Sequence, residues 1–219
     1  MNEYSRTKTD RLSSSDAAEF VWDTMDCTQV HAYVGPVLES WLQQVKPCRV
    51  LDLGCGNGAL TARLAKFATQ MVGTDHSDTG VQIARQHFPS IQFFRSDVGE
   101  VLPVAHHGAY DMVLATEVIE HLFKPRAVFE RAREALRPGG ALIITTPFHG
   151  YWKNLALAVS GKFDEHWHPM RDYGHIKFFS RRTLGLLLEE QGFLAARWAR
   201  VGRVPLFARS MIVMASLQK

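Results

Sequence analysis

The chain has 219 residues, 46% of them hydrophobic, and 25 basic and 22 acidic side chains give it a formal net charge of +3. This length suits one domain, and so weak a charge argues against a nucleic-acid or membrane-surface partner. Cys27, Cys48 and Cys55 form no CxxC pair, which favours a reducing, cytoplasmic compartment. No apolar run approaches the ~20 residues of a transmembrane helix, so we expect no membrane span.

The N-terminal region divides into a polar tail and a helical segment. Residues 1–16 lack the apolar core of a secretory signal, and we predict a mobile tail there. From about residue 16 to residue 44, apolar side chains recur at helical spacing, which predicts a helical N-terminal cap that ends before Pro47. Residues 17–219 are expected to form a single domain.

After Pro47, short apolar strands alternate with helices. The predicted strands are residues 49–53, 71–75, 91–95, 110–115, 141–146, 198–201 and 211–217. The predicted helices are residues 59–67, 77–87, 125–136 and 180–190. Uninterrupted apolar strands between helices are typical of a parallel sheet that helices cover on both faces. The predicted fold class is therefore α/β, with a doubly wound, mostly parallel sheet.

Residues 50–58, Val-Leu-Asp-Leu-Gly-Cys-Gly-Asn-Gly, are the most informative stretch of the chain. Glycine lets a backbone turn sharply and lets a ligand approach closely, and the helix that follows offers unpaired N–H groups. The stretch predicts a small-molecule pocket at a strand-to-helix turn. Its G-x-G-x-G spacing differs from the G-x-G-x-x-G of dinucleotide sites, which argues against a dehydrogenase. Asp52 favours a cationic ligand over a pyrophosphate.

Two further acids lie at strand ends. Asp75 stands 17 residues after Gly58, where an acid holds ribose hydroxyls in dinucleotide folds. Asp97 follows the third strand, where a carboxylate can accept a hydrogen bond from an exocyclic amine. Each acid alone could instead stabilise a helix N-terminus or a turn. Their joint placement with the glycine loop is more typical of an adenosine pocket.

Five short motifs follow one another along the chain. They are DLGCGNG at 52–58, GTD at 73–75, SDV at 96–98, YDMVL at 110–114 and LRPGG at 136–140. In this order they resemble the motifs of class I S-adenosylmethionine-dependent methyltransferases, over about residues 48–147. The resemblance implies a Rossmann-like methyltransferase fold of seven strands, the last one antiparallel and placed at 211–217. It also implies S-adenosyl-L-methionine as the cofactor.

The same resemblance implies the donor-binding residues. The glycine loop would hold the methionine moiety, the acid after the second strand the ribose, and the segment after the third strand the adenine. The implied residues are Asp52, Gly54, Cys55, Gly56, Asn57, Gly58, Asp75, His76, Ser77, Asp97, Val98 and Thr116. Within this set we expect the Cys55 side chain to be a small filler and not a nucleophile.

The segment 116–122, Thr-Glu-Val-Ile-Glu-His-Leu, follows the fourth strand. If it is helical, Glu117, Glu120 and His121 lie on one face, at i, i+3 and i+4. Carboxylates with one imidazole suit Mg²⁺, Mn²⁺ or Zn²⁺. The alternative is a site without metal, in which the acids favour a helix N-terminus and the histidine packs or acts in the active site.

The E-x-x-E-H string is similar to that of two branches of the family, the ubiquinone-biosynthesis catechol O-methyltransferases and the small-RNA 2′-O-methyltransferases. Both have a further histidine before a K-F element, which corresponds to His175 here. The resemblance implies Glu117, Glu120 and His121 as metal ligands, with His175 as a fourth ligand or a general base. His121, His175 and Glu117 are the implied catalytic residues.

The alternation of strands and helices breaks between Pro147 and Phe179, in a stretch rich in aromatic residues and histidine. So long a connection is usually functional, and ligands of open α/β sheets bind at the strand ends that it follows. We predict a lid insertion after strand five, on the substrate side, at residues 148–178. Its aromatic rings are expected to pack mainly with one another, and His149, His166 and His168 to be loop surface residues rather than ligands.

Together these features predict O-methylation of a small hydroxylated acceptor of the phenol, catechol or quinol type, assisted by a divalent metal or by a base. The alternatives are a ribose 2′-O-methyltransferase of RNA 3′ ends, N- or C-methylation of a small molecule, and a donor-binding protein without activity. Weak charge and the lack of a basic run count against RNA. We expect a monomer or a homodimer.

Overall fold

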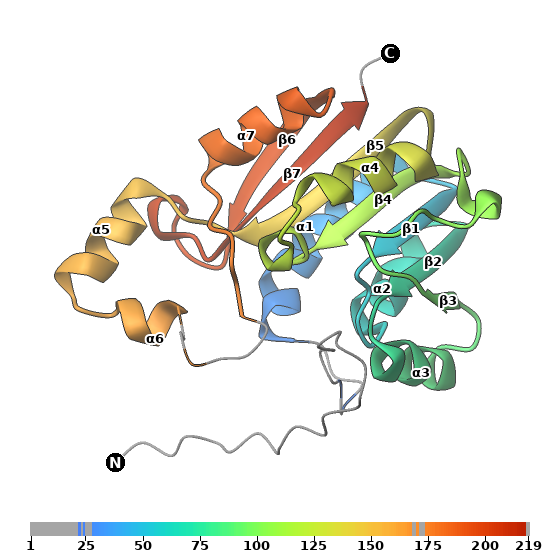
Figure 1. Cartoon of the computed structure of the whole chain (residues 1–219), viewed down its shortest axis with the longest axis horizontal. Coiled ribbons are helices and arrows are strands. Elements are labelled where there is room, and N and C mark those ends of the chain that lie inside the picture. The colour runs from blue at the N-terminus through green and yellow to red at the C-terminus, as the bar shows by residue number, and fades with distance from the viewer. Residues whose placement is uncertain (1–21, 23, 25–27, 168–169, 171–173, 218–219) are drawn as a thin grey trace.

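The computed structural model describes residues 22, 24, 28–167, 170 and 174–217. Seven strands form one sheet in the order β3-β2-β1-β4-β5-β7-β6 (Figure 1). The strands are β1 Arg49–Leu53, β2 Gln70–Asp75, β3 Gln92–Arg95, β4 Tyr110–Thr116, β5 Leu136–Pro147, β6 Phe193–Val201 and β7 Ser210–Leu217. Only β7 runs antiparallel to its neighbours, β5 and β6. The predicted sheet, with its antiparallel last strand, is confirmed.

Helices cover both faces of the sheet. The helices packed against it are α1 Gln29–Val45, α2 Ala59–Leu64, α3 Asp78–His87, α4 Arg126–Ala135 and α7 Arg181–Glu190, whereas α5 Tyr151–Val159 and α6 Phe163–Trp167 lie to one side of the sheet (Figure 1). Along β4, Met112 and Leu114 pack with α1 and α2, whereas Val113 and Ala115 pack with α4 and α7. This alternation follows from the pleat of a strand, and it explains why the central strands read as continuous apolar runs.

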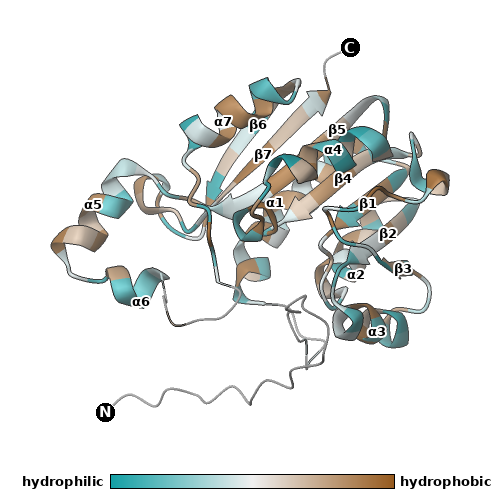
Figure 2. Cartoon of the chain, viewed as in Figure 1, coloured by the Kyte–Doolittle hydropathy of each residue, from teal (hydrophilic) through white to brown (hydrophobic). Residues whose placement is uncertain are grey.

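Hydropathy follows the same arrangement (Figure 2). The hydrophobic residues gather along the central strands, and α3 and α4 carry both hydrophobic and hydrophilic stripes. Among the residues that the structure describes, no helix combines the length and the apolar content needed to cross a bilayer.

The sequence-based boundaries differ from the observed ones at both ends of the chain. The predicted tail at 1–16 lies outside the described residues, and so does most of the segment before α1. Strand β6 begins at Phe193, five residues earlier than predicted. It is an edge strand that pairs only with β7. Its first residues, Phe-Leu-Ala-Ala, show no alternation of apolar and polar side chains, so no period-two pattern marks where the strand begins. The segment 148–178, expected as a loop, contains α5 and α6.

Gly58, which precedes α2, offers a first test of the fold. Its φ is 78°, and an added Cβ would lie 2.7 Å from the Ala84 Cβ and 2.9 Å from a ring carbon of Phe93. We expect Gly58→Ala to lower the free energy of unfolding by about 2–4 kcal/mol, from backbone strain and overpacking. Urea denaturation would measure this loss. Gly185→Ala is the matched control, because its added Cβ meets nothing within 4 Å inside α7; equal effects of the two changes would contradict the account.

Candidate functional site

The glycine loop begins directly after β1. Gly54, Gly56 and Gly58 have φ values of 77°, 55° and 78°, which lie in the left-handed region that favours glycine. The N–H groups of Gly54 and Cys55 donate to the Thr74 carbonyl at 2.7 and 3.0 Å, which holds the loop against the end of β2. The sharp turn predicted here is confirmed. Burial raises the pKa of the Cys55 thiol well above its usual value, so this side chain is a packed group and no nucleophile.

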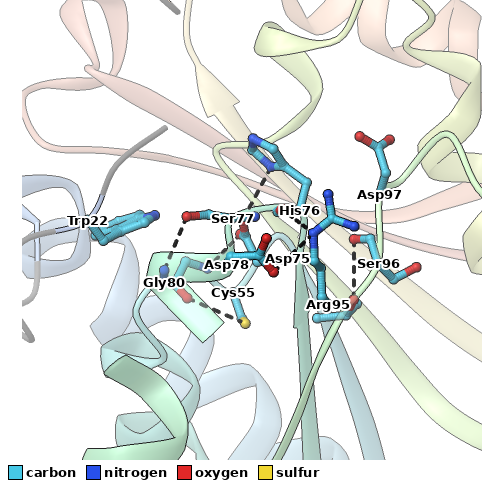
Figure 3. A network of polar contacts seen from close by, with 12 residues as sticks. Trp22, Cys55, Asp75, His76, Ser77, Asp78, Gly80, Arg95, Ser96 and Asp97 are labelled. Carbon is cyan, nitrogen blue, oxygen red and sulfur yellow. Dashed lines mark hydrogen bonds and ion pairs between the residues drawn. The ribbon is translucent and has the colours of Figure 1, made fainter. Parts of the chain in front are cut away.

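Asp75 ties the glycine loop to the start of α3 (Figure 3). Its Oδ2 accepts a hydrogen bond from the Gly56 N–H at 2.8 Å, and its Oδ1 accepts one from the Ser77 N–H at 2.9 Å. The Asp75 Oδ1 also lies 3.3 Å from the His76 Nδ1. The second lone pair of Oδ2 can still accept a hydrogen bond from a ribose hydroxyl. The Ser77 hydroxyl accepts from the Gly80 N–H at 3.1 Å, which confirms that Ser77 caps the helix.

Asp97 follows β3, and it lies farther from Asp75 than Ser96 does (Figure 3). It is exposed, and its Oδ1 accepts a hydrogen bond from the Gly99 N–H at 2.6 Å. The carboxylate therefore caps its own turn. One oxygen remains to face a ligand, so adenine recognition by Asp97 stays a prediction.

Asp52, at the end of β1, is 2% exposed. Its Oδ2 accepts a hydrogen bond from the Thr61 hydroxyl at 2.6 Å, but its buried Oδ1 has no partner. Burial raises the pKa of Asp52 to about 6, and the neighbouring charge of Asp75 adds to this rise. An unpaired buried carboxylate oxygen beside a glycine loop fits a cationic group, such as the ammonium of an amino-acid moiety.

Trp22 also contacts the site, and no pattern in the sequence pointed to it. An added Cβ on Gly56 or Gly80 would meet the Trp22 ring, so the indole lies close over both glycines (Figure 3). The backbone N–H of Trp22 donates a hydrogen bond to the Thr79 hydroxyl at 3.1 Å. Trp22 therefore contacts the glycine loop and the start of α3, although it lies far from both in sequence.

The segment after β4 does not form a regular helix. Glu117 has a φ of 54°, and a short 3-10 turn forms at Ile119–His121. The condition under which Glu117, Glu120 and His121 would share one helical face is therefore not met. The Glu117 N–H donates to the Thr145 carbonyl at 3.1 Å, so this residue continues the pairing of β4 with β5. The positive φ of Glu117 lies outside the right-handed helical region, so no helix includes this residue.

The two glutamates nonetheless come together. The Glu117 carboxylate accepts hydrogen bonds from the hydroxyls of Thr145, at 2.8 Å, and Ser210, at 3.4 Å. The carboxylate of Glu120, which is fully buried, accepts from the Thr146 hydroxyl at 3.0 Å. Burial raises the pKa of both carboxyls, and the charge of Glu117 raises that of Glu120 further.

Three of the four predicted metal ligands converge. One potential ligand atom each from Glu120, His121 and His175 lies within 4.8 Å of the other two. The buried Glu120 Oε1 has no hydrogen-bond partner and lies 4.0 Å from the His175 Nε2. Backbone N–H groups of Ile176 and Lys177 donate to the Glu120 carbonyl at 2.9 and 3.0 Å, which brings His175 to this place. One carboxylate oxygen and two imidazoles fit a divalent transition metal. Glu117 lies outside this cluster.

A cavity of about 540 Å³ opens beside these residues. Its walls come from the start of α1, the segment after β5 and the connection between β6 and β7. The lining includes Tyr33, Glu117, His149, Lys153, His175 and Arg209. The role of 148–178 as a substrate lid stays a prediction.

The histidines after β5 do not all match their prediction. His149 is 7% exposed and lines the cavity, so its assignment as a surface residue is wrong. Burial and the nearby Lys153 lower the pKa of His149 to about 4, and its imidazole is neutral at pH 7. His166 is half-buried and lines the same cavity. His168 lies outside the described residues.

Sequence comparisons identify relatives of this chain. A family model described as a methyltransferase domain matches residues 27–195. The ubiquinone biosynthesis O-methyltransferase of Dinoroseobacter shibae is 32% identical over 151 residues, which are 67% of this chain and 60% of that protein. The protein of the same name in Azorhizobium caulinodans is 31% identical over 156 residues, 69% of this chain and 61% of that one. The chain thus spans about 60% of the length of these curated relatives.

Solved structures share the fold at low identity. A S-adenosylmethionine-dependent methyltransferase from Mesorhizobium loti has a TM-score of 0.66 at 19% identity, covering 83% of this chain and 96% of that one. Magnesium protoporphyrin IX methyltransferase from Synechocystis PCC 6803, with S-adenosylhomocysteine bound, has a TM-score of 0.64 at 21% identity, covering 84% of this chain and 82% of that one.

Proposed function

The chain belongs to the S-adenosylmethionine-dependent methyltransferases, and from this membership we propose that it methylates a hydroxyl group of a small phenol, catechol or quinol. The observation that carries the proposal is the convergence of Glu120, His121 and His175 beside a cavity that Glu117 and His175 line, at the carboxyl ends of the parallel strands. A hydroxyl acceptor must lose a proton, and carboxylates or an imidazole can take it. The names of the curated relatives, ubiquinone biosynthesis O-methyltransferases, also favour transfer to oxygen.

We place the donor over the glycine loop. The unpaired Oδ1 of Asp52 would accept its ammonium group, and Asp75 would accept its ribose hydroxyls. His76, Ser77, Asp97 and Val98 would surround the adenine. In this arrangement the methyl group is directed past Thr116, at the end of β4, toward the cavity. A sulfonium methyl is already a good electrophile, so alignment of the acceptor oxygen with the methyl and the sulfur is the main requirement.

Two routes can remove the acceptor proton. In the first, Glu120, His121 and His175 hold a divalent cation, which would lower the pKa of a bound hydroxyl. In the second, Glu117 or His175 accepts the proton directly, because both line the cavity. Glu117 hydrogen-bonds Thr145 and Ser210, so its carboxylate is held in a fixed orientation in either route.

Removal of metal separates the two routes. If a cation is needed, EDTA should lower turnover of a catechol by about 10-fold or more, and added Mg²⁺, Mn²⁺ or Zn²⁺ should restore it. Methyl transfer from radiolabelled donor to catechol, caffeate and phenol would be followed with and without chelator. Turnover unchanged by EDTA, but lost in His175→Ala, would favour the base.

A matched control keeps this test specific. His87→Ala removes an exposed histidine of α3, which lies outside the lining of the cavity, and it should leave turnover unchanged. Failure of the folded protein to methylate any hydroxylated acceptor, with bound metal or without, would contradict the proposed function.

A further inference from the structure

The cavity beside Glu117 is rich in positive charge. Among the described residues that line it, the cations are Lys153, Lys162, Arg203 and Arg209, whereas Glu117 is the one acid. Three of these cations are exposed at the rim, but Lys153 is only 8% exposed. The chemistry of this site depends on what balances that buried ammonium.

Lys153 projects from the first turn of α5. Its Nζ donates one hydrogen bond, to the Phe148 carbonyl at 2.8 Å, although an ammonium has three protons to donate. Within the described part of the chain, no carboxylate lies within 4.0 Å of it. Burial and the charges of Arg203 and Arg209 lower the pKa of Lys153 to about 8, so it keeps most of its charge at pH 7. A buried ammonium that no carboxylate contacts directly is costly, and an anionic ligand would relieve that cost.

The rest of the cavity suits a flat ring. Its volume of about 540 Å³ is within the usual range for small-molecule sites. The rings of Tyr33, Trp167 and Phe178 line it, and the Trp167 and Phe178 rings stack on each other with centroids 5.2 Å apart. Lys153 and Glu117 both line this space and interact electrostatically, so one small acceptor can reach both.

We infer that the methyl acceptor carries an anionic group, a carboxylate or a phosphate, which binds Lys153 with the help of Arg203 and Arg209 while its hydroxyl faces Glu117. This inference rests on the proposed methyl transfer and narrows its substrate class. The acceptor would be a hydroxylated aromatic acid or phosphate ester. Binding of the anion also orients the ring, so the charge selects which hydroxyl meets the methyl group.

A pair of acceptors that differ at one carboxyl group, charged in one and esterified in the other, provides the test. Caffeate and its methyl ester share one catechol, and we expect kcat/KM for the acid to exceed that for the ester by about 10-fold or more. In Lys153→Met the ratio of the two kcat/KM values should fall toward one. A catechol carrying a phosphate ester, measured in parallel, distinguishes the two kinds of anion.

Further measurements keep the inference falsifiable. Lys153→Met could disturb α5, so Arg203→Gln, at an exposed rim position, serves as a second variant and should lower the same ratio. Lys66→Met removes an exposed lysine outside the cavity and should preserve the ratio. Quenching of tryptophan fluorescence by caffeate, in protein loaded with S-adenosylhomocysteine, reports binding without turnover.

The outcomes separate this inference from the proposed function. Equal kcat/KM for acid and ester in the unaltered protein would overturn the inference while leaving methyl transfer intact. A Lys153→Met variant that loses both activities in equal proportion would show that Lys153 has only a structural role, which would also overturn it. Absence of transfer to either compound would instead count against the proposed function.

Discussion

Replacement of Glu120 by glutamine should lower kcat by about 100-fold or more while leaving the affinity for S-adenosylhomocysteine within about twofold. The amide oxygen can still accept the hydrogen bond that the Thr146 hydroxyl now gives to Oε2 at 3.0 Å, so the local packing persists. What is lost is the carboxylate whose Oε1 is buried without a partner, 4.0 Å from the His175 Nε2. The metal route needs this carboxylate as a ligand, and the route in which His175 is the base needs it beside that imidazole.

Initial rates at saturating donor, together with calorimetric titration of S-adenosylhomocysteine, would measure these two effects separately. Glu189→Gln changes an exposed acid on α7 that does not line the cavity, and it should behave like the unaltered protein. If Glu120→Gln retained full kcat, the assignment of this cluster to the chemical step would be wrong. Urea denaturation should show that the variant is folded.

Replacement of Asp52 by asparagine should weaken donor binding by about 10- to 100-fold. The carboxylate is buried, and only one of its oxygens is paired, with Thr61. An amide keeps the shape but removes the charge that would meet the donor's ammonium group. Titration of S-adenosylmethionine and of S-adenosylhomocysteine would measure the loss; equal affinities in the two proteins would contradict the placement of the donor at Asp52.

The same variant should change how stability depends on pH in the absence of donor. The pKa of Asp52 is about 6 in the folded protein and about 3.9 in an unfolded chain. Between these values the folded state holds the Asp52 proton more tightly. The contribution of Asp52 to stability is therefore largest at low pH and is lost as pH rises through about 6. About two pKa units correspond to about 3 kcal/mol, an upper bound for this carboxyl.

Asp52→Asn should lack this component. Its free energy of unfolding, relative to that of the unaltered protein, should therefore rise between pH 4 and pH 7.5 in urea titrations without ligand. The buried Glu117 and Glu120 are present in both proteins, so their contributions cancel in the comparison. A difference that stays constant with pH would show that Asp52 titrates normally.

The sequence predicts local features well where a short-range rule determines them. The glycines of the loop need positive φ angles, and Ser77 caps α3 through a bond three residues away. The sequence does not predict the positions of residues that are determined by contacts between distant segments. Glu117 has a positive φ, and its backbone N–H pairs with the Thr145 carbonyl on the neighbouring strand.

Two residues of the site show the same limit. His149 is buried because the chain after β5 folds back. The backbone N–H of His149 donates a hydrogen bond to the Phe179 carbonyl at 2.9 Å. Trp22 reaches the glycine loop from the region before α1 and bonds Thr79, 57 positions away. No local pattern in the sequence indicates the contact made by His149 or the contact made by Trp22. The approach of His175 to Glu120 was predictable only through the resemblance to known families.

Calorimetric titration of the purified chain with S-adenosylhomocysteine and, separately, with NAD tests the central claim most directly. The claim is that the loop at 54–58, with Asp52 and Asp75, binds a methyl donor with a cationic head and an adenosine tail. It predicts binding of S-adenosylhomocysteine at one molecule per chain and no heat from NAD. A folded protein that does not bind S-adenosylhomocysteine, or one that binds NAD in its place, would contradict it.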